Sequence, residues 1–227
     1  MIPTIIFFLL RRLKIIPPHT ADKIILLFRK PARVIALLVL LLTLTRGVSA
    51  QESRLQYIIK RKGSEVGTMT VVRNTLGERT TYFLQSEVKT RFVFLITATG
   101  QEEAVFEKGV LVSSRIYRKM NGSEKANKKM TRSGANYVVT RDNKSEVLGN
   151  APIWYTMLNL YDHEPENIAA VYSDNFQKVL PITVIAPHHY KIKFPDGNYS
   201  EYFYHRGICT SILLHHSLYT ASFELKR

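Results

Sequence analysis

Apolar and polar residues alternate with a period of two through most of the chain from residue 55 onward. The apolar positions are rich in β-branched and aromatic residues, which is typical of half-buried strands. Short polar or glycine-containing turns separate these segments, with Gly100 near one of the breaks. The pattern predicts strands over residues 55–60, 65–73, 79–89, 92–99, 102–107, 110–120, 128–132, 136–141, 169–173, 179–186, 190–194, 199–205, 209–215 and 218–225.

Two turns have clear chemical signatures. Asn121-Gly122 favours positive φ at both central positions of a hairpin, and Pro195-Asp196-Gly197 combines a fixed φ with a residue that tolerates positive φ. Between the two groups of strands, residues 152–161 carry apolar residues at three- and four-residue spacing, which suits one or two helical turns. We therefore expect an all-β fold: a single antiparallel, strongly curved sheet or incomplete barrel, with one short helical segment near residues 152–162.

A different pattern precedes the strands. Arg29, Lys30 and Arg33 come before an apolar stretch over residues 34–44, and small residues at 48–50 complete the pattern of a secretory signal peptide over residues 29–50. The stretch is too short to span a bilayer, which takes about 20 residues. We expect cleavage near Ala50-Gln51, a periplasmic or secreted location, and one β-rich mature domain over residues 51–227.

Residues 1–28 leave two interpretations open. Either translation begins near Arg29 and the sequence starts too early, or residues 2–10 form a second membrane element, although nine apolar residues cannot cross the hydrocarbon layer.

The strongly basic composition is concentrated in this leader. Eight of the 32 Lys/Arg and one of the 18 Asp/Glu precede residue 51, so the net charge falls from +14 for the whole chain to +7 for the remainder. We therefore expect no nucleic-acid partner.

The single cysteine, Cys209, excludes an internal disulfide and is expected to be a small buried residue. No cysteine lies directly after the apolar stretch, so we expect no lipid anchor after cleavage.

Candidate catalytic and metal sites are weak in the sequence. A metal site would require His188 or His189, His215 or His216, and His163 or Glu164 to meet in space, and no spacing matches a known metal motif. No nucleophile lies in a G-x-S-x-G elbow. We expect no catalytic residue, no metal ligand and no cofactor.

Several short motifs together resemble a family of exported, functionally uncharacterised proteins of Gram-negative bacteria, chiefly Bacteroidetes, classed as a domain of unknown function. The motifs are Val66-Gly67-Thr68-Met69-Thr70, Tyr82, Ser86-Glu87, Phe106-Glu107-Lys108-Gly109-Val110-Leu111, Ser114, Asn121-Gly122, Leu160-Tyr161, Glu164-Pro165, Val171-Tyr172-Ser173, Pro195-Asp196-Gly197, Tyr202, Tyr204 and Gly207. The chain is also distantly similar to periplasmic half-barrel carriers of lipoproteins. The resemblance implies an envelope location and an antiparallel β-fold, and it brings no catalytic residue.

The first functional hypothesis is a soluble periplasmic, non-enzymatic protein that binds an apolar or amphipathic ligand such as a lipid. The expected ligand-binding residues are aromatic, because aromatic side chains supply large apolar contact areas: Tyr82, Phe106, Trp154, Tyr161, Tyr202 and Tyr204. One alternative is a module that binds an envelope protein through an exposed strand edge. Another is a metal-dependent hydrolase built on His163, His189 and His215. Whether the sheet encloses a cavity or a filled core stays open.

Overall fold

The computed structural model describes residues 51–91, 95–141 and 144–226. The predictions of an early start over residues 1–28 and of a signal peptide over residues 29–50 lie outside the described residues, as do the first three residues of the predicted strand 92–99. The described residues all belong to one compact unit, Ser49–Arg227.

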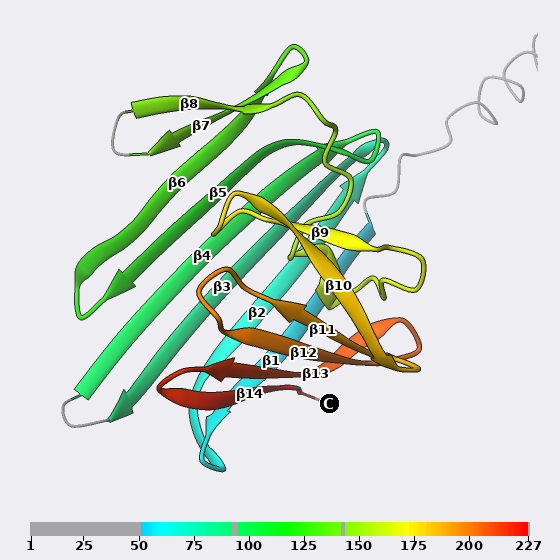
Figure 1. Cartoon of the computed structure of the whole chain (residues 1–227). Helices are drawn as coiled ribbons and strands as arrows, with labels where there is room; N and C mark the ends of the chain where they lie inside the picture. The colour runs from blue at the N-terminus through cyan, green and yellow to red at the C-terminus, as the bar shows by residue number, and fades with distance from the viewer. Residues whose placement is uncertain (1–50, 92–94, 142–143, 227) are drawn as a thin grey trace, which may run out of the picture. The chain divides into compact units, whose positions relative to one another are not determined.

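The described residues form one sheet of 14 antiparallel strands and a single turn of 3-10 helix (Figure 1). The predicted all-β class is therefore confirmed. The elements are β1 Gln51–Arg61, β2 Ser64–Leu76, β3 Arg79–Arg91, β4 Leu95–Glu107, β5 Val110–Met120, β6 Ser123–Ser133, β7 Asn136–Arg141, β8 Lys144–Gly149, η1 Asn159–Tyr161, β9 Ala170–Ser173, β10 Lys178–Ala186, β11 His189–Lys193, β12 Tyr199–His205, β13 Ile208–His216 and β14 Tyr219–Leu225.

The topology is simple: almost every strand pairs with its neighbours in sequence. The spatial order runs β8 to β1, then β14 back to β9, so the first and last strands of the unit meet in the middle of the sheet. Tyr57 of β1 pairs with Leu225 of β14 at this seam. The edges are β8 and β9, and the sheet does not close into a barrel.

Alternation along each strand decides which side chains face the core. In β12, Ser200, Tyr202 and Tyr204 are buried, whereas Tyr199 and Phe203 are only half-buried. The same alternation in the other strands gives two clusters of buried apolar side chains, one on β1–β7 and the other on β10–β13. Phe223 of β14 packs against both clusters, so the two groups of strands share one continuous core at the seam.

The connection between β8 and β9, residues 150–169, fills the space that the sheet encloses. Ile153 and Leu158 belong to the first cluster, while Tyr155 and Leu160 belong to the second. Because this connection supplies core residues to both clusters, the interior of the described sheet is packed with side chains. The question that the sequence left open is answered in favour of a filled core.

Buried tyrosine hydroxyls satisfy the backbone of this connection. Tyr137 of β7 accepts a hydrogen bond from Ile153 N–H at 3.1 Å and donates one to Leu111 O at 2.9 Å. Tyr204 of β12 donates to Leu160 O at 2.7 Å. Since a buried irregular segment cannot pair its backbone as a strand does, these hydroxyls replace the missing partners.

Three details differ from the predicted elements. Gly100 does not end a strand: β4 runs through it, pairing Gly100 with Ser86 on one side and Arg118 on the other. The strand β8 was missed, since its six residues are all exposed and show no apolar face. The helical segment predicted near 152–162 shortens to η1. Residues 152–155 are neither helix nor turn, and Thr156 forms a parallel bridge with Tyr172 of β9.

Candidate functional site

The six aromatic residues expected to bind a ligand fall into two groups. Tyr202 and Tyr204 are buried in the second core cluster, and Tyr161 packs against both clusters. These three side chains therefore serve the core. Tyr82 and Phe106 are also buried, as members of the first core cluster, but together with the exposed Trp154 they line one surface cleft of about 390 Å³.

We call this hollow the Trp154 cleft. Strands β2, β3 and β4 form one wall, the turn between β4 and β5 adds Gly109, and the connection that follows β8 supplies the rest. Its lining residues are Arg73, Thr75, Thr80, Tyr82, Phe106, Gly109, Trp154, Tyr155, Asn159, His163 and Ile168.

One side of the cleft is aromatic. Tyr82 and Phe106 meet edge to face, with ring centroids 5.9 Å apart. Trp154 remains 59% exposed and lies over Gly109, where a β-carbon would come 3.9 Å from the indole Cε3. The largely exposed tryptophan offers a flat apolar surface to a ligand, whereas the rings of Tyr82 and Phe106 are almost fully buried.

The other side of the cleft is polar and holds a buried ion pair. Arg73 Nη1 lies 3.1 Å from Oδ2 of Asp162, whose side chain is only 4% exposed, and the Tyr82 hydroxyl donates to Asp162 Oδ1 at 3.2 Å. No group among the described residues accepts a hydrogen bond from the buried Arg73 Nε.

Burial controls the ionisation of these groups. It raises the pKa of the Asp162 carboxyl, and the Arg73 guanidinium and the Tyr82 hydroxyl offset part of that rise. Burial together with the Asp162 carboxylate raises the pKa of Tyr82 to about 12. Tyr82 therefore stays protonated at neutral pH and acts as a hydrogen-bond donor.

A second hollow next to the cleft is a poorer candidate. It measures about 500 Å³ and lies at the turns that follow β2 and β4. Its charged groups pair with one another: Arg79 with Glu107 at 3.0 Å and Lys108 with Glu78 at 3.5 Å. These exposed pairs leave little free charge to direct a ligand.

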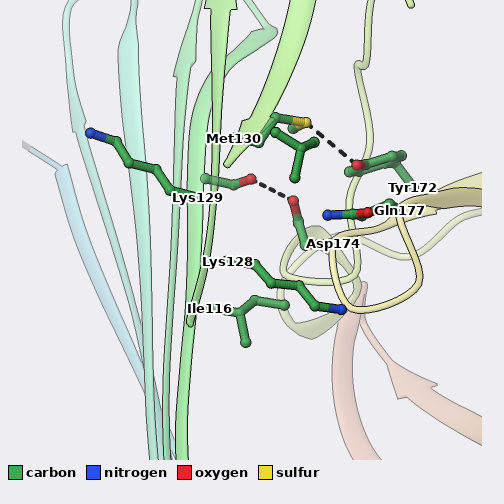
Figure 2. A pocket seen from close by; sticks show the side chains of 9 residues that line it. Ile116, Lys128, Lys129, Met130, Tyr172, Asp174 and Gln177 are labelled. Atoms are coloured by element: carbon green, nitrogen blue, oxygen red, sulfur yellow. Dashed lines mark hydrogen bonds between the residues drawn. The ribbon is translucent and has the colours of Figure 1, made fainter. Parts of the chain in front are cut away.

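The turn between β9 and β10 packs against β5, β6 and β7, as Figure 2 shows. Asp174 accepts a hydrogen bond from Ser114 at 2.5 Å, and Lys128 donates to Asn175 O at 2.5 Å. Lys128 points toward the turn, whereas the neighbouring Lys129 points away from it (Figure 2). The space left between these elements is about 10 Å³, enough for one water at most, so this contact is structural.

Asp174 is the most perturbed carboxyl of this contact. Burial raises its pKa to about 7, and the Glu102 carboxylate adds to the rise, while the Ser114 hydroxyl lowers it. Burial also lowers the pKa of Lys128, with repulsion from Arg141 and Arg118.

The histidines do not form the metal site considered for a hydrolase. His189 lies 2.9 Å from Glu201 and stacks on Phe203, while His215 stacks on Tyr199. His163 lines the Trp154 cleft. Within the part of the chain that the structure describes, no potential ligand group joins these three histidines.

Cys209 is fully buried, and burial raises the pKa of its thiol to about 12. The expectation of a small buried residue is therefore confirmed.

No helix within the described residues has the length and apolar character needed to cross a membrane.

Arg73, Asp162 and Asn159 were not among the residues expected from the sequence, and His163 was considered only as a metal ligand. The Tyr82–Asp162 contact spans 80 residues, and nothing in a single sequence pairs positions so far apart. The only signal was local: a polar run, Asp162-His163-Glu164, directly after a predicted helical turn.

The fold places the chain in the class of all-β proteins built on one open antiparallel sheet. The connection between the edge strands β8 and β9 packs against the inner face of this sheet. The chain belongs to the family described as domain of unknown function (DUF6134), whose model matches residues 57–226. The predicted membership in a family of unknown function is thus confirmed. The assignment to Bacteroidetes and the likeness to lipoprotein carriers stay predictions.

Among solved structures, the chain is similar to a β-barrel-like protein of the domain of unknown function DUF1849 from Brucella abortus. The identity is 11% and the TM-score 0.49, over 77% of this chain and 95% of that one. A search of curated proteins finds no match.

Proposed function

We propose that this protein acts outside the cytoplasm, after loss of the signal peptide, as a non-enzymatic binding protein for a small amphipathic ligand. The ligand occupies the Trp154 cleft. The observation that supports this most is the 59% exposed Trp154, which lines a cleft together with the polar residues Arg73 and Asn159.

The two sides of the cleft divide the ligand's chemistry. The apolar part lies mainly on the exposed Trp154, and the polar head meets Arg73 and Asn159. A volume of about 390 Å³ is at the lower end of ligand-binding pockets, which span roughly 300–1,000 Å³. The filled interior leaves no room for a whole lipid inside the sheet, so the proposal narrows to binding one end of an amphiphile at the surface.

A non-enzymatic role agrees with the bonding of the titratable groups. Asp162 is tied to Arg73 and to Tyr82, and burial keeps its carboxyl away from solvent. These three groups stabilise one another and hold the cleft in shape, as expected for a preformed binding site.

The chain contains a single tryptophan, so its fluorescence reports directly on the cleft. We expect palmitate, added below its micelle concentration, to shift Trp154 emission to shorter wavelength and to saturate. Dodecyl maltoside, which has an uncharged head, tests whether the head must be anionic.

Calorimetry on variants locates the binding. Trp154→Ala, at an exposed position, should weaken palmitate binding roughly tenfold or more, since an interface tryptophan typically contributes at least 1–2 kcal/mol. Arg115→Gln, at an exposed position on β5, controls for the loss of one positive charge in Arg73→Gln. It should leave palmitate binding unchanged.

Protein purified from its own host should carry a small amphiphile, detectable by mass spectrometry of an organic extract. The absence of any extractable amphiphile, together with no emission shift for either probe, would overturn the proposal.

A second function is favoured by a specific observation on β10. Strand β9 pairs with Lys178–Pro181, and Ile182 N–H still donates to Ala169 O at 2.9 Å. Beyond Ile182, no described strand pairs with β10 on that side, where Val184 is 63% exposed and Ile185 is also exposed. An extended segment of an envelope protein can add to such an edge. Val184→Lys should abolish this pairing and leave the Trp154 emission response intact, which separates the two functions.

A further inference from the structure

A group of three potential metal ligands lies beyond the Trp154 cleft. Glu164 and Glu166 belong to the connection after η1, and His188 lies in the turn between β10 and β11. One ligand atom from each lies within 4.8 Å of the other two. The sequence analysis considered His188 and Glu164 as partners but expected no metal site, and it did not consider Glu166.

Local backbone structure holds the two glutamates together. Pro165 separates them, and Glu166 N–H donates to Glu164 O at 3.0 Å in a tight three-residue turn. His188 is held from the other side, because its carbonyl accepts a hydrogen bond from Tyr204 N–H of β12 at 2.9 Å. The three side chains therefore come from two anchored backbone segments.

Glu164 gives the independent sign of a missing partner. Its side chain is only 4% exposed. Oε1 accepts a hydrogen bond from the Tyr190 hydroxyl at 2.9 Å and lies 2.9 Å from His188 Nδ1. Oε2 is buried, and none of the described residues donates a hydrogen bond to it. Leaving a buried carboxylate oxygen without a donor or a cation is costly.

We propose that Glu164, Glu166 and His188 bind a divalent transition-metal ion of the Zn²⁺ class. Two carboxylates and one imidazole are ligands that Zn²⁺ accepts, with a fourth position left for water. The ion would take the place of the hydrogen bond between His188 Nδ1 and Glu164 Oε1, and it would also satisfy Oε2. The imidazole selects against Mg²⁺ and Ca²⁺, which prefer oxygen ligands alone.

The Tyr190 hydroxyl orients Glu164 as an outer-shell partner. Metal binding joins the connection that carries Asn159 and His163 to the β10–β11 turn. The ion therefore stabilises one wall of the Trp154 cleft without occupying it, and this site stands independently of the proposed ligand.

The test is equilibrium dialysis of the purified, chelator-treated protein against Zn²⁺, with the bound metal measured by mass spectrometry. We expect one tight equivalent per chain and a higher melting temperature with Zn²⁺. Glu166→Gln and His188→Asn, both at exposed positions, should each weaken Zn²⁺ binding at least about tenfold while the apo protein keeps its melting temperature.

His205→Asn and Glu124→Gln are matched controls at exposed positions outside the group, and both should bind Zn²⁺ as the unchanged protein does. Three outcomes would overturn the proposal: no tight equivalent of Zn²⁺, variants that bind as well as the unchanged protein, or equal affinity for Ca²⁺. Each concerns metal alone, so none depends on the outcome of the palmitate experiments.

Discussion

Two buried aspartates show how the partner decides the fate of a carboxyl group. Asp162 faces the Arg73 guanidinium at 3.1 Å, so its charged form keeps an opposite charge next to it. Asp174 is buried with a neutral donor, the Ser114 hydroxyl, and with the Glu102 carboxylate as an unfavourable neighbour. The nearby cations are otherwise engaged: Arg118 pairs with Glu102, and Lys128 donates to Asn175 O. Asp174 is therefore a group that destabilises the fold when it ionises.

Asp174→Asn should stabilise the protein above neutral pH. The pKa of Asp174 is about 7 in the folded state against an ordinary value of 3.8. Below pH 4 the carboxyl is protonated in both states; as pH rises toward 7, only the unfolded state releases the proton, so stability falls. The loss is on the order of 4 kcal/mol at pH 8.

Urea unfolding of both proteins between pH 4 and pH 8 measures this effect. The difference in unfolding free energy should be small at pH 4 and grow with pH. Glu103→Gln, at an exposed position of β4, controls for the loss of one charge. A difference that is independent of pH would contradict the prediction.

At the scale of the element, close approach of strands matters more than propensity. A β-carbon on Gly67 of β2 would lie 2.0 Å from Glu87 O, a backbone atom of β3. A β-carbon on Gly100 of β4 would lie 2.9 Å from Ser86 Oγ, which a rotation of the side chain can move. Both glycines lie inside strands. In each case an atom of the neighbouring strand β3 leaves too little room for a β-carbon.

The two glycines therefore form a matched pair for mutation. Gly67→Ala requires the β2–β3 backbone to shift and should lower the unfolding free energy by about 3 kcal/mol. Gly100→Ala should cost about 1 kcal/mol or less, because only a hydroxyl must move. Chemical denaturation followed by circular dichroism measures both, and equal costs would show that strand spacing is not the cause.

At the scale of the whole unit, the seam between β1 and β14 joins the two groups of strands. Lys60 and Glu224 form an ion pair across it at 2.5 Å, and both side chains are substantially exposed. Phe223, beside Glu224, packs against both core clusters. Exposed ion pairs contribute about 0–1 kcal/mol, whereas loss of a packed phenylalanine costs about 3 kcal/mol. Apolar burial therefore dominates the stability of the seam.

Phe223→Ala should accordingly lower the unfolding free energy by about 2–3 kcal/mol, and Lys60→Ala by less than about 1 kcal/mol. Both variants should keep a single unfolding transition, because the seam makes the sheet cooperative. A larger effect for Lys60→Ala, or separate transitions for the two groups of strands, would contradict this view.

Much of the fold was predictable because alternation is a local property. The burial of Tyr202 and Tyr204 on one face of β12 follows from period two alone, as does the all-β class. The exposed strand β8 escaped prediction because no apolar face marks it. Gly100 was misinterpreted because a glycine inside a strand and one in a turn look alike when the adjacent strand is unknown.

The candidate sites were predictable only in part. All six aromatic residues were expected to bind a ligand, but Tyr161, Tyr202 and Tyr204 serve the core. Tyr82 and Phe106 are buried in the core as well as lining the cleft, and only Trp154 is exposed there. The presence of aromatic residues in a sequence does not separate these roles, because the same residue types are used for core packing and for ligand binding.

The sequence by itself determined most of the strands, their inward faces and membership in a family of unknown function, since these depend on residues close together in the chain. Only the tertiary structure decided that the connection after β8 fills the sheet. It also brought Arg73 to Asp162 and His188 to the two glutamates. The physical reason is that such contacts join residues far apart in the chain, and folding of the sheet alone sets the distances between them.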